Sequence, residues 1–369
     1  MSAASIGPFD RPDPSAPFPV AGFRLHIFNP SNDLALTVDA PSYTPPHAVA
    51  EMERRMAAFP MRWAREGDVV LTDWHTRYDS LVRQAGHPLL PTPWGWSKAL
   101  RNRLLRFGVP ASLMPTPEEL DTWRSCSSRR FAADYIHQLL PLLVPLGIPL
   151  AGHGMRFCAS LAEWREGQGS YTPSEGSAYI FKPEYSSSGR GITIGRTPPS
   201  GAFPLLADSF LGDKRLDCGL LFHITPAHSV HFLGFSVFYT RPNGTYLRQE
   251  RASQARLRSL IEEALGTPSP VLDRLISTHA QLLTRTLAPR YRGPLSIDML
   301  IARDPQGRVL LHPCLEINLR MTMGIAWLLE EACRDDRSRY AEKKECVTVV
   351  KVSKKSLLCI GQQKVQTQW

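Results

Sequence analysis

Two short stretches, far apart in the sequence, most constrain how this chain can fold. The first, 181–192, reads FKPEYSSSGRGI and places Lys182 at the end of an expected strand, just ahead of a loop of small residues. The second, 315–320, reads LEINLR and places Glu316 and Asn318 on one face of another strand, because side chains two residues apart on a strand point the same way. Cations and backbone N–H groups bind phosphate oxygens, whereas carboxylate and amide oxygens bind magnesium. A fold that brings both stretches to one cleft would suit a metal-bound triphosphate.

Composition places the chain among globular proteins with more than one lobe. Its 369 residues suffice for two or three lobes, and 43% of them are hydrophobic against 21% charged. No apolar run is long enough to cross a bilayer, so we expect no membrane partner. The seven cysteines are scattered and form no CxxC pair, which favours reduced thiols and a cytoplasmic location.

The net charge of +9 raises the question of a nucleic-acid partner. The arginines, however, are spread through every segment, and the sequence shows no basic helix and no basic stripe interleaved with aromatic residues. Affinity for small anionic substrates explains the charge equally well. We therefore expect no nucleic-acid partner, and a basic RNA-associated protein stays a third hypothesis behind the two given below.

The patterns divide the chain into four parts. Residues 1–22 are rich in Pro, Ala and Ser without a basic start followed by an apolar run, so we expect a disordered leader. Residues 23–127 alternate short strands and helices, which predicts an open parallel α/β domain. Residues 128–335 hold longer paired strands with helices and predict an α+β domain. Residues 336–369 are a basic tail of uncertain structure, either an ordinary tail or a foreign or frame-altered C-terminus, because six of the nine lysines lie there.

Hydrophobic periodicity and turn residues predict the individual elements. In the first domain we expect strands at 24–28 and 68–71, a polar loop at 29–33, and helices at 97–107 and 117–124. The next domain should begin with a helix at 128–143. Farther along we expect a strand at 179–183, helices at 253–265 and 271–287, and two hairpins that pair 216–223 with 230–239 and 296–302 with 308–317.

Oxygen-bearing side chains gather on the last expected hairpin. Asp298 sits among apolar residues, where an unpaired carboxylate would be costly. With Glu316 and Asn318 on the adjoining strand, it would form a set of hard oxygen ligands that magnesium prefers. The alternative is a buried ion pair between Asp298 and Arg320.

The small-residue loop is a candidate phosphate cradle. It consists of Ser186, Ser187, Ser188, Gly189, Arg190 and Gly191. Small side chains let backbone amides approach phosphate oxygens, and glycine permits the positive φ that such a cradle often needs. Lys182, one of only three lysines before the tail, can neutralise phosphate as a compact cation. The pattern GxxxxGK[ST] is absent, so this is not a P-loop.

Three motifs in this order resemble the ATP-grasp superfamily: Phe181-Lys-Pro with the following Ser-Gly-Arg-Gly, Gly293-Pro-Leu-Ser-Ile-Asp298, and Glu316-Ile-Asn-Leu-Arg320. The resemblance covers residues 24–329. It implies a pre-ATP-grasp open parallel α/β domain followed by an ATP-grasp domain of two α+β lobes, with ATP and Mg2+ as cofactors.

The resemblance also implies roles for individual residues. Lys182 would contact the α- and β-phosphates and the loop 186–191 would cover the triphosphate. Asp208 and Leu211 would bind the adenosine. Asp298, Glu316 and Asn318 would hold magnesium, and Arg320 would stabilise the transferring phosphoryl group.

Three positions depart from the family pattern. Arg129 or Arg130 stands where the family has an earlier phosphate-binding lysine, and arginine keeps the charge. Glu184 adds a negative charge beside the expected triphosphate. Asp208 replaces a longer glutamate.

The leading functional hypothesis is an ATP-dependent ligase that activates a small carboxylate substrate as an acyl-phosphate for attack by an amine, a thiol or a similar nucleophile. The polar loop at 29–33 and the segment at 43–46 would face the acceptor substrate, because ligands bind at the carboxyl ends of strands in open α/β sheets. The second hypothesis is a non-catalytic nucleotide-binding protein of the same fold.

A zinc site is a weaker interpretation of another cluster. The residues are Cys218, His223, His228 and His231. Their spacing matches none of the common tetrahedral patterns, so a hairpin with surface histidines is favoured.

Overall fold

The computed structural model describes residues 22–167, 178–186, 189–241, 244–266 and 269–339. The expected leader, Ser187, Ser188 and nearly all of the basic tail therefore lie outside the described residues.

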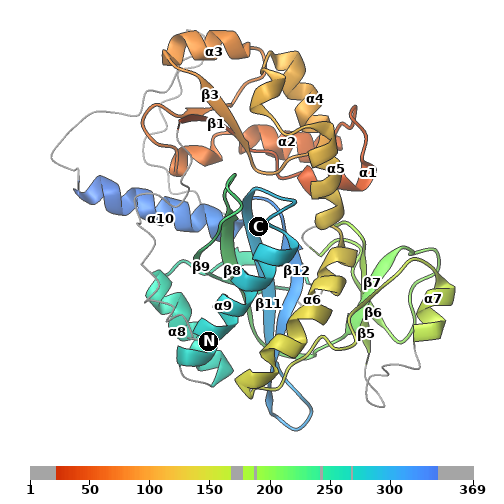
Figure 1. The fold of residues 1–369 in the computed structure, drawn as a ribbon. Coiled ribbons are helices and arrows are strands. Elements are labelled where there is room, and N and C mark those ends of the chain that lie inside the picture. The colour runs from red at the N-terminus through yellow and green to blue at the C-terminus, as the bar shows by residue number, and fades with distance from the viewer. Residues whose placement is uncertain (1–21, 168–177, 187–188, 242–243, 267–268, 340–369) are drawn as a thin grey trace, which may run out of the picture.

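The first domain is built on a small parallel sheet. Its strands run in the order β2-β1-β3, and β1 pairs in parallel with both neighbours, which confirms the expected open parallel sheet. The bounds are β1 (Phe23–Ile27), β2 (Val69–Val70) and β3 (Leu89–Pro93). The helices packed around it in Figure 1 are α1 (Asn32–Val38), α2 (His47–Arg55), α3 (Tyr78–Ala85), α4 (Lys98–Phe107) and α5 (Pro117–Cys126), with 3-10 turns at Phe59–Arg62 and Ala111–Leu113.

Side-chain caps fix the starts of the helices that the sequence predicted. Ser97 Oγ accepts a hydrogen bond from the backbone N of Leu100 at the start of α4. Thr116 and Glu119 form a reciprocal capping box at the start of α5. Such caps satisfy N–H groups that have no partner within the helix. One expectation was wrong: the polar loop ends earlier, because Asn32 and Asp33 already belong to α1.

A five-stranded antiparallel sheet forms the centre of the molecule, in the order β10-β9-β8-β11-β12. Both predicted hairpins are present as neighbouring pairs, β8 with β9 and β11 with β12. The strands are β8 (Asp213–Ile224), β9 (Val230–Thr240), β10 (Tyr246–Gln249), β11 (Gly293–Arg303) and β12 (Val309–Asn318). The helices are α6 (Arg129–Leu143), α8 (Gln254–Leu265), α9 (Ser269–Thr286) and α10 (Met323–Arg339), with a 3-10 turn at Val144–Leu146.

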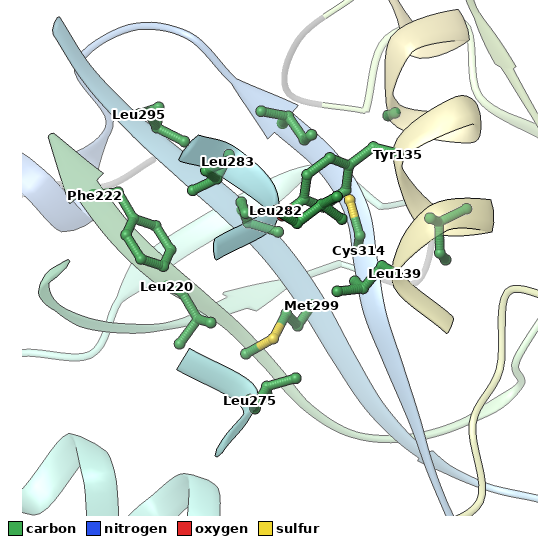
Figure 2. Close-up of a cluster of buried hydrophobic side chains, with 14 of the residues drawn as sticks. Tyr135, Leu139, Leu220, Phe222, Leu275, Leu282, Leu283, Leu295, Met299 and Cys314 are labelled. Atoms are coloured by element: carbon green, nitrogen blue, oxygen red, sulfur yellow. The ribbon is translucent and has the colours of Figure 1, made fainter. Parts of the chain in front are cut away.

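Alternation along β8 divides the helices between the two faces of this sheet. Leu220 and Phe222 belong to the same buried cluster as side chains of α6, α8 and α9, whereas Leu221 packs with Ile325 of α10. Successive strand residues point to opposite faces, so α10 covers the face that α6, α8 and α9 leave open. Figure 2 shows the first cluster, in which Tyr135 of α6 and Leu282 of α9 lie over the strands.

A smaller antiparallel sheet lies beside the central sheet, as Figure 1 shows. Its strand order is β4-β7-β5-β6. Trp164 of the helix α7 packs against Tyr179 and Phe181 of β5 to form its own core. Only β5 was predicted; the bounds are β4 (Arg156–Cys158), α7 (Leu161–Glu166), β5 (Tyr179–Pro183), β6 (Thr193–Gly195) and β7 (Leu205–Ser209). The expected order, a parallel α/β domain followed by two α+β lobes, is confirmed.

The five described cysteines are free thiols, and Cys333 alone among them is partly exposed. No helix within the described ranges has the length and apolar character needed to cross a membrane.

The buried His279 of α9 gives the fold a dependence on pH. Its ring has no exposed surface, stacks on Tyr135, and lies 3.0 Å (Nδ1) from the Tyr135 hydroxyl. Burial lowers the pKa of His279 from 6.5 to about 3. The unfolded chain therefore binds a proton near pH 6.5 that the folded chain does not, and folding stability is complete above pH 6.5 and declines below it.

We expect the free energy of unfolding to fall by about 1.4 kcal/mol per pH unit per buried histidine below pH 6.5. His279→Phe keeps an aromatic ring at this position but cannot bind a proton. Between pH 6.5 and 5 its free energy of unfolding should therefore fall less steeply than that of the wild type, by about 1.4 kcal/mol per pH unit. Urea unfolding at several pH values measures the slope. His75→Phe is the control, because its side chain is 96% exposed. An unchanged slope in His279→Phe would show that His279 does not stay neutral in the folded chain.

Candidate functional site

A cleft of about 520 Å3 lies between the smaller sheet and the central sheet. It brings together most of the residues predicted from the sequence, although they come from α6, β5, β7, β11 and β12. The predicted residues that line it are Arg129, Lys182, Gly189, Asp208, Leu211, Asp298, Glu316, Asn318 and Arg320. Ser186 lies next to the cleft in contact with Arg129, whereas Arg190 and Gly191 are exposed and do not line it.

Lys182 projects from β5 into this cleft and is only 7% exposed. Burial, together with the nearby Arg129, lowers the pKa of its ammonium, and Glu316, Asp208 and Asp298 oppose that shift. Within the described residues the ammonium has neither a hydrogen bond nor an ion pair. A buried cation in this state favours an anionic ligand, because pairing offsets the cost of removing the charge from water.

Two carboxylates face each other across the last hairpin. Asp298 of β11 and Glu316 of β12 are directly paired in the strand register. Burial and the Glu316 charge raise the pKa of Asp298 to about 7. Asn318 Nδ2 donates to Asp298 Oδ2 at 3.0 Å, and Ser296 Oγ donates to Asp298 Oδ1 at 3.3 Å. Two acids placed together in a buried site repel, and a divalent cation between them would remove the repulsion.

The donor set of this site fits magnesium in chemistry. Carboxylate and amide oxygens are ligands that magnesium prefers, and substrate phosphates and water complete its coordination. The described residues contain no group of three or more His, Cys, Asp or Glu side chains arranged to hold a metal, because here the third oxygen belongs to an amide. That oxygen, Asn318 Oδ1, accepts a hydrogen bond from Arg320 Nη2 at 3.0 Å.

Arg129, and not Arg130, is the arginine that faces the cleft. It begins α6, where Ser128 caps the helix, and its side chain is 4% exposed. Nη2 donates to Glu316 Oε1 at 2.8 Å, while Nη1 donates to the Pro183 carbonyl at 2.5 Å and to Ser186 Oγ at 3.0 Å. The exposed Arg130 instead lies over the ring of Phe157.

The alternative ion pair between Asp298 and Arg320 is wrong, because Arg320 pairs with Asp33 of α1. Nε donates to both Asp33 oxygens, at 2.9 and 3.1 Å, and Nη2 lies 2.8 Å from Oδ2. A bidentate ion pair of this kind fixes the plane of the guanidinium. Asp33 therefore positions Arg320 and connects the first domain to the central sheet.

Asp208 ends up beside a histidine that sequence analysis missed. Asp208 Oδ2 lies 2.7 Å from His312 Nε2, both residues are 1% exposed, and Asp208 Oδ1 accepts from the Ser209 backbone N. Both residues line the cleft, as does Leu211. A single histidine among the apolar residues of β12 gave no signal in the sequence, because only the meeting of β12 with β7 creates the pair.

Glu184 lies beside the cleft, where it lines a small pocket with Glu316, Asn318 and Arg320. It is absent from the residues that line the cleft, and its Oε1 accepts from Ser128 Oγ at 2.7 Å. The carboxylate therefore lies at the N-terminus of α6, where the helix dipole stabilises negative charge.

The glycines of the predicted cradle adopt the left-handed backbone that the sequence suggested. Gly189 has φ +74° and Gly191 φ +72°. A Cβ on Gly189 would lie 2.8 Å from the backbone of Gly244, so this loop approaches a neighbouring chain segment too closely for any side chain.

The expectation of surface histidines on the β8–β9 hairpin was wrong for His223. It is 4% exposed, and Cys218 on the same strand is fully buried. Burial and the nearby Arg24 lower the pKa of His223 to about 4.

Two antiparallel sheets that enclose one cleft, after a parallel α/β domain, form the arrangement that the sequence resemblance implied. No family model matches the chain, and no curated protein matches it.

Several solved structures are weakly similar to this chain. An N5-carboxyaminoimidazole synthetase from Staphylococcus aureus complexed with ADP is 11% identical, with a TM-score of 0.38 over 82% of this chain and 72% of that chain. A biotin carboxylase–βγ-ATP complex from Campylobacter jejuni is 10% identical, with a TM-score of 0.40 over 69% and 56%. The D-cycloserine synthetase DcsG is 12% identical, with a TM-score of 0.39 over 84% and 99%. Likeness at this level assigns no substrate.

Removing the Arg129 side chain should destabilise the fold, since the Glu316 carboxylate and three oxygens of Pro183 and Ser186 would lose this donor. We expect Arg129→Leu to lower the free energy of unfolding by about 2–3 kcal/mol. Arg130→Leu, one residue along the same helix and exposed, should lower it by less than about 1 kcal/mol. Urea unfolding at pH 7 measures both, and equal losses would contradict the structural role given to Arg129.

Proposed function

We propose that the protein is an ATP-dependent ligase that activates a small carboxylate as an acyl-phosphate, which an amine, a thiol or a similar nucleophile then attacks. The observation that carries this proposal is the cleft that gathers the Lys182 ammonium and the oxygens of Asp298, Glu316 and Asn318. The catalytic unit would span 128–335, and 23–127 would be the preceding α/β domain.

The nucleotide would lie along the cleft with its triphosphate toward the last hairpin. Lys182 would neutralise phosphate charge at the end of β5, and the loop 186–191, with its two positive-φ glycines, would cover the triphosphate. The adenosine would lie at the other end, beside Asp208 and Leu211. Asp298, Glu316 and Asn318 would hold Mg2+, which supplies positive charge at the phosphate oxygens.

The first step would be phosphoryl transfer to the carboxylate. A carboxylate oxygen forms a bond to the γ-phosphorus, the bond from that phosphorus to the β–γ bridging oxygen breaks, and ADP leaves. Arg320, held in plane by Asp33, would stabilise the negative charge on the transferring group. The nucleophile would then attack the acyl carbon and release inorganic phosphate. Catalysis would depend on positioning and on charge neutralisation.

A specific observation supports the second candidate function, a non-catalytic nucleotide-binding protein. Arg129 donates to Glu316 and Arg320 donates to the oxygen of Asn318. Asp298 accepts from Asn318 and Ser296, so all three proposed metal ligands already have protein partners. A metal could bind fully only after these contacts are rearranged.

Mg-ATP should raise the melting temperature of the wild-type protein, because a ligand that binds only the folded state stabilises it, by about 2.7 kcal/mol at a concentration of 100 Kd. Lys182→Met should weaken Mg-ATP binding at least tenfold and reduce the shift. Lys98→Met is the matched control, because Lys98 pairs with Asp121 and does not line the cleft. Equal shifts in all three proteins would argue against the proposed phosphate contact.

Hydroxylamine should trap the acyl-phosphate as a hydroxamate when Mg-ATP and a panel of carboxylic acids are supplied, with ADP formed in equal amount. Arg320→Met should slow hydroxamate formation about a hundredfold or more while changing Mg-ATP affinity less, since its main contact is with the transferring group. Colorimetric hydroxamate assay and nucleotide chromatography give the two rates. Mg-ATP binding without hydroxamate from any acid would favour the non-catalytic candidate.

A further inference from the structure

A second cavity, of about 350 Å3, lies where the first domain meets the central sheet. Its walls come from β1 and β3 on one side and from the ends of β8 and β11 on the other. The segment 319–321, just after β12, forms part of its lining. Cavities of this size between domains are ordinary sites for small molecules.

The walls of this cavity are rich in aromatic side chains. Trp63, Trp94, Trp96, Trp123 and Tyr291 all line it. Several walls are rigid: Trp94 and Trp63 belong to a buried cluster with Phe28, and Tyr291 packs against Trp123 with ring centroids 5.1 Å apart. Such surfaces suit a flat apolar group, which can stack on them with little loss of conformational freedom.

The polar groups of the cavity indicate the charge of its ligand. Arg24, His26, His223, Arg292 and Arg320 line it, and none of the described lining residues is an aspartate or a glutamate. Arg24 is 7% exposed, so its charge is mostly withdrawn from water. His26, Arg292 and Arg320 already pair with carboxylates behind the lining, those of Asp68, Glu119 and Asp33. A guanidinium has five N–H donors, so a ligand carboxylate could accept from those that these pairs leave over, whereas an ammonium would find no carboxylate in the lining itself. The cavity therefore suits an acid, not an amine.

The cavity meets the nucleotide cleft at one place. Trp94 and Arg320 line both spaces, and Arg320 is the only charged residue that does so among the described residues. Its guanidinium contacts Asn318 of the proposed magnesium site. A ligand whose carboxylate lies against Arg320 and whose body lies against the tryptophans would thus present its reacting oxygen toward the triphosphate.

We propose that this second cavity binds the acid substrate, and that this substrate is a carboxylic acid with an apolar, aromatic body. The assignment rests on the proposed function, because the acid is the phosphoryl acceptor of that reaction. Its carboxylate oxygen bonds to the γ-phosphorus as the bond to the bridging oxygen breaks and ADP leaves, so no further reactant is required for this step.

Isothermal titration with 3-phenylpropanoate tests the assignment, with 3-phenylpropylamine and acetate as the comparison ligands. We expect the acid to bind at least tenfold more tightly than either, since the amine lacks the carboxylate and acetate lacks the aromatic body. The fluorescence of the lining tryptophans should change on the same concentration scale. Equal or tighter binding of the amine or of acetate would overturn the proposal.

Leu90→Trp tests the location, because Leu90 lines the cavity from β3 and a larger side chain there would fill it. Binding of 3-phenylpropanoate should fall at least tenfold, while the thermal shift with Mg-ATP stays as in the wild type. Leu105→Trp is the matched control, since Leu105 is 38% exposed on α4 and lines neither space. Unchanged binding in a folded Leu90→Trp protein would overturn the location. If that variant does not fold, the wild-type comparison of acid with amine and the fluorescence change decide the proposal.

The two proposals fail in different ways. A wild-type protein that shifts with Mg-ATP and forms hydroxamate from short polar acids, but not from 3-phenylpropanoate, retains the ligase function and refutes the aromatic substrate. A protein that binds 3-phenylpropanoate but neither shifts with Mg-ATP nor forms hydroxamate refutes the ligase, and with it the substrate role of this cavity.

Discussion

The contact between the two antiparallel sheets depends on buried side chains of opposite charge that lie close together in the cleft. Lys182, Arg129, Asp298 and Glu316 are brought together from four separate elements, β5, α6, β11 and β12. Removing any charge from water is costly unless a partner lies close. Burial raises the pKa of Asp298 and lowers the pKa of Lys182. Both directions mean that neighbouring charges offset only part of the cost of burying the charged form of each group. The cleft therefore suits a ligand that brings a cation to the Asp298 carboxylate and anionic phosphates to the Lys182 ammonium.

The pair between Arg320 and Asp33 gives the first domain a place in this arrangement. It holds α1 against the end of β12, and the same arginine borders both the cleft and the aromatic cavity. The first domain therefore contributes a wall of the second cavity and also fixes the side chain at the junction. A fold with the two antiparallel sheets alone would lack both.

The sequence predicted those parts of the site that follow from local rules. Spacing of two residues on a strand placed Glu316 and Asn318 on one face, and hairpin pairing brought Asp298 beside them. It did not predict β3, because Pro91 and Pro93 argue against a strand, although proline is tolerated in an edge strand such as this one. The pairs of Asp33 with Arg320 and of His312 with Asp208 were missed because each joins elements far apart in the sequence, and no local pattern encodes which elements will meet.

Arg129 links the metal end of the cleft to the phosphate loop. Nη2 donates to Glu316 and to the Ser186 carbonyl, and Nη1 donates to the Pro183 carbonyl and the Ser186 hydroxyl, at the start of the glycine loop. A cation that binds the Glu316 oxygen competes with Arg129 for it, and a displaced guanidinium would weaken its hydrogen bonds to the three oxygens of Pro183 and Ser186. Occupation of the acidic hairpin and the position of the loop are therefore coupled through one side chain. Lysine, with its single nitrogen and no fixed plane, could not hold both ends in this way.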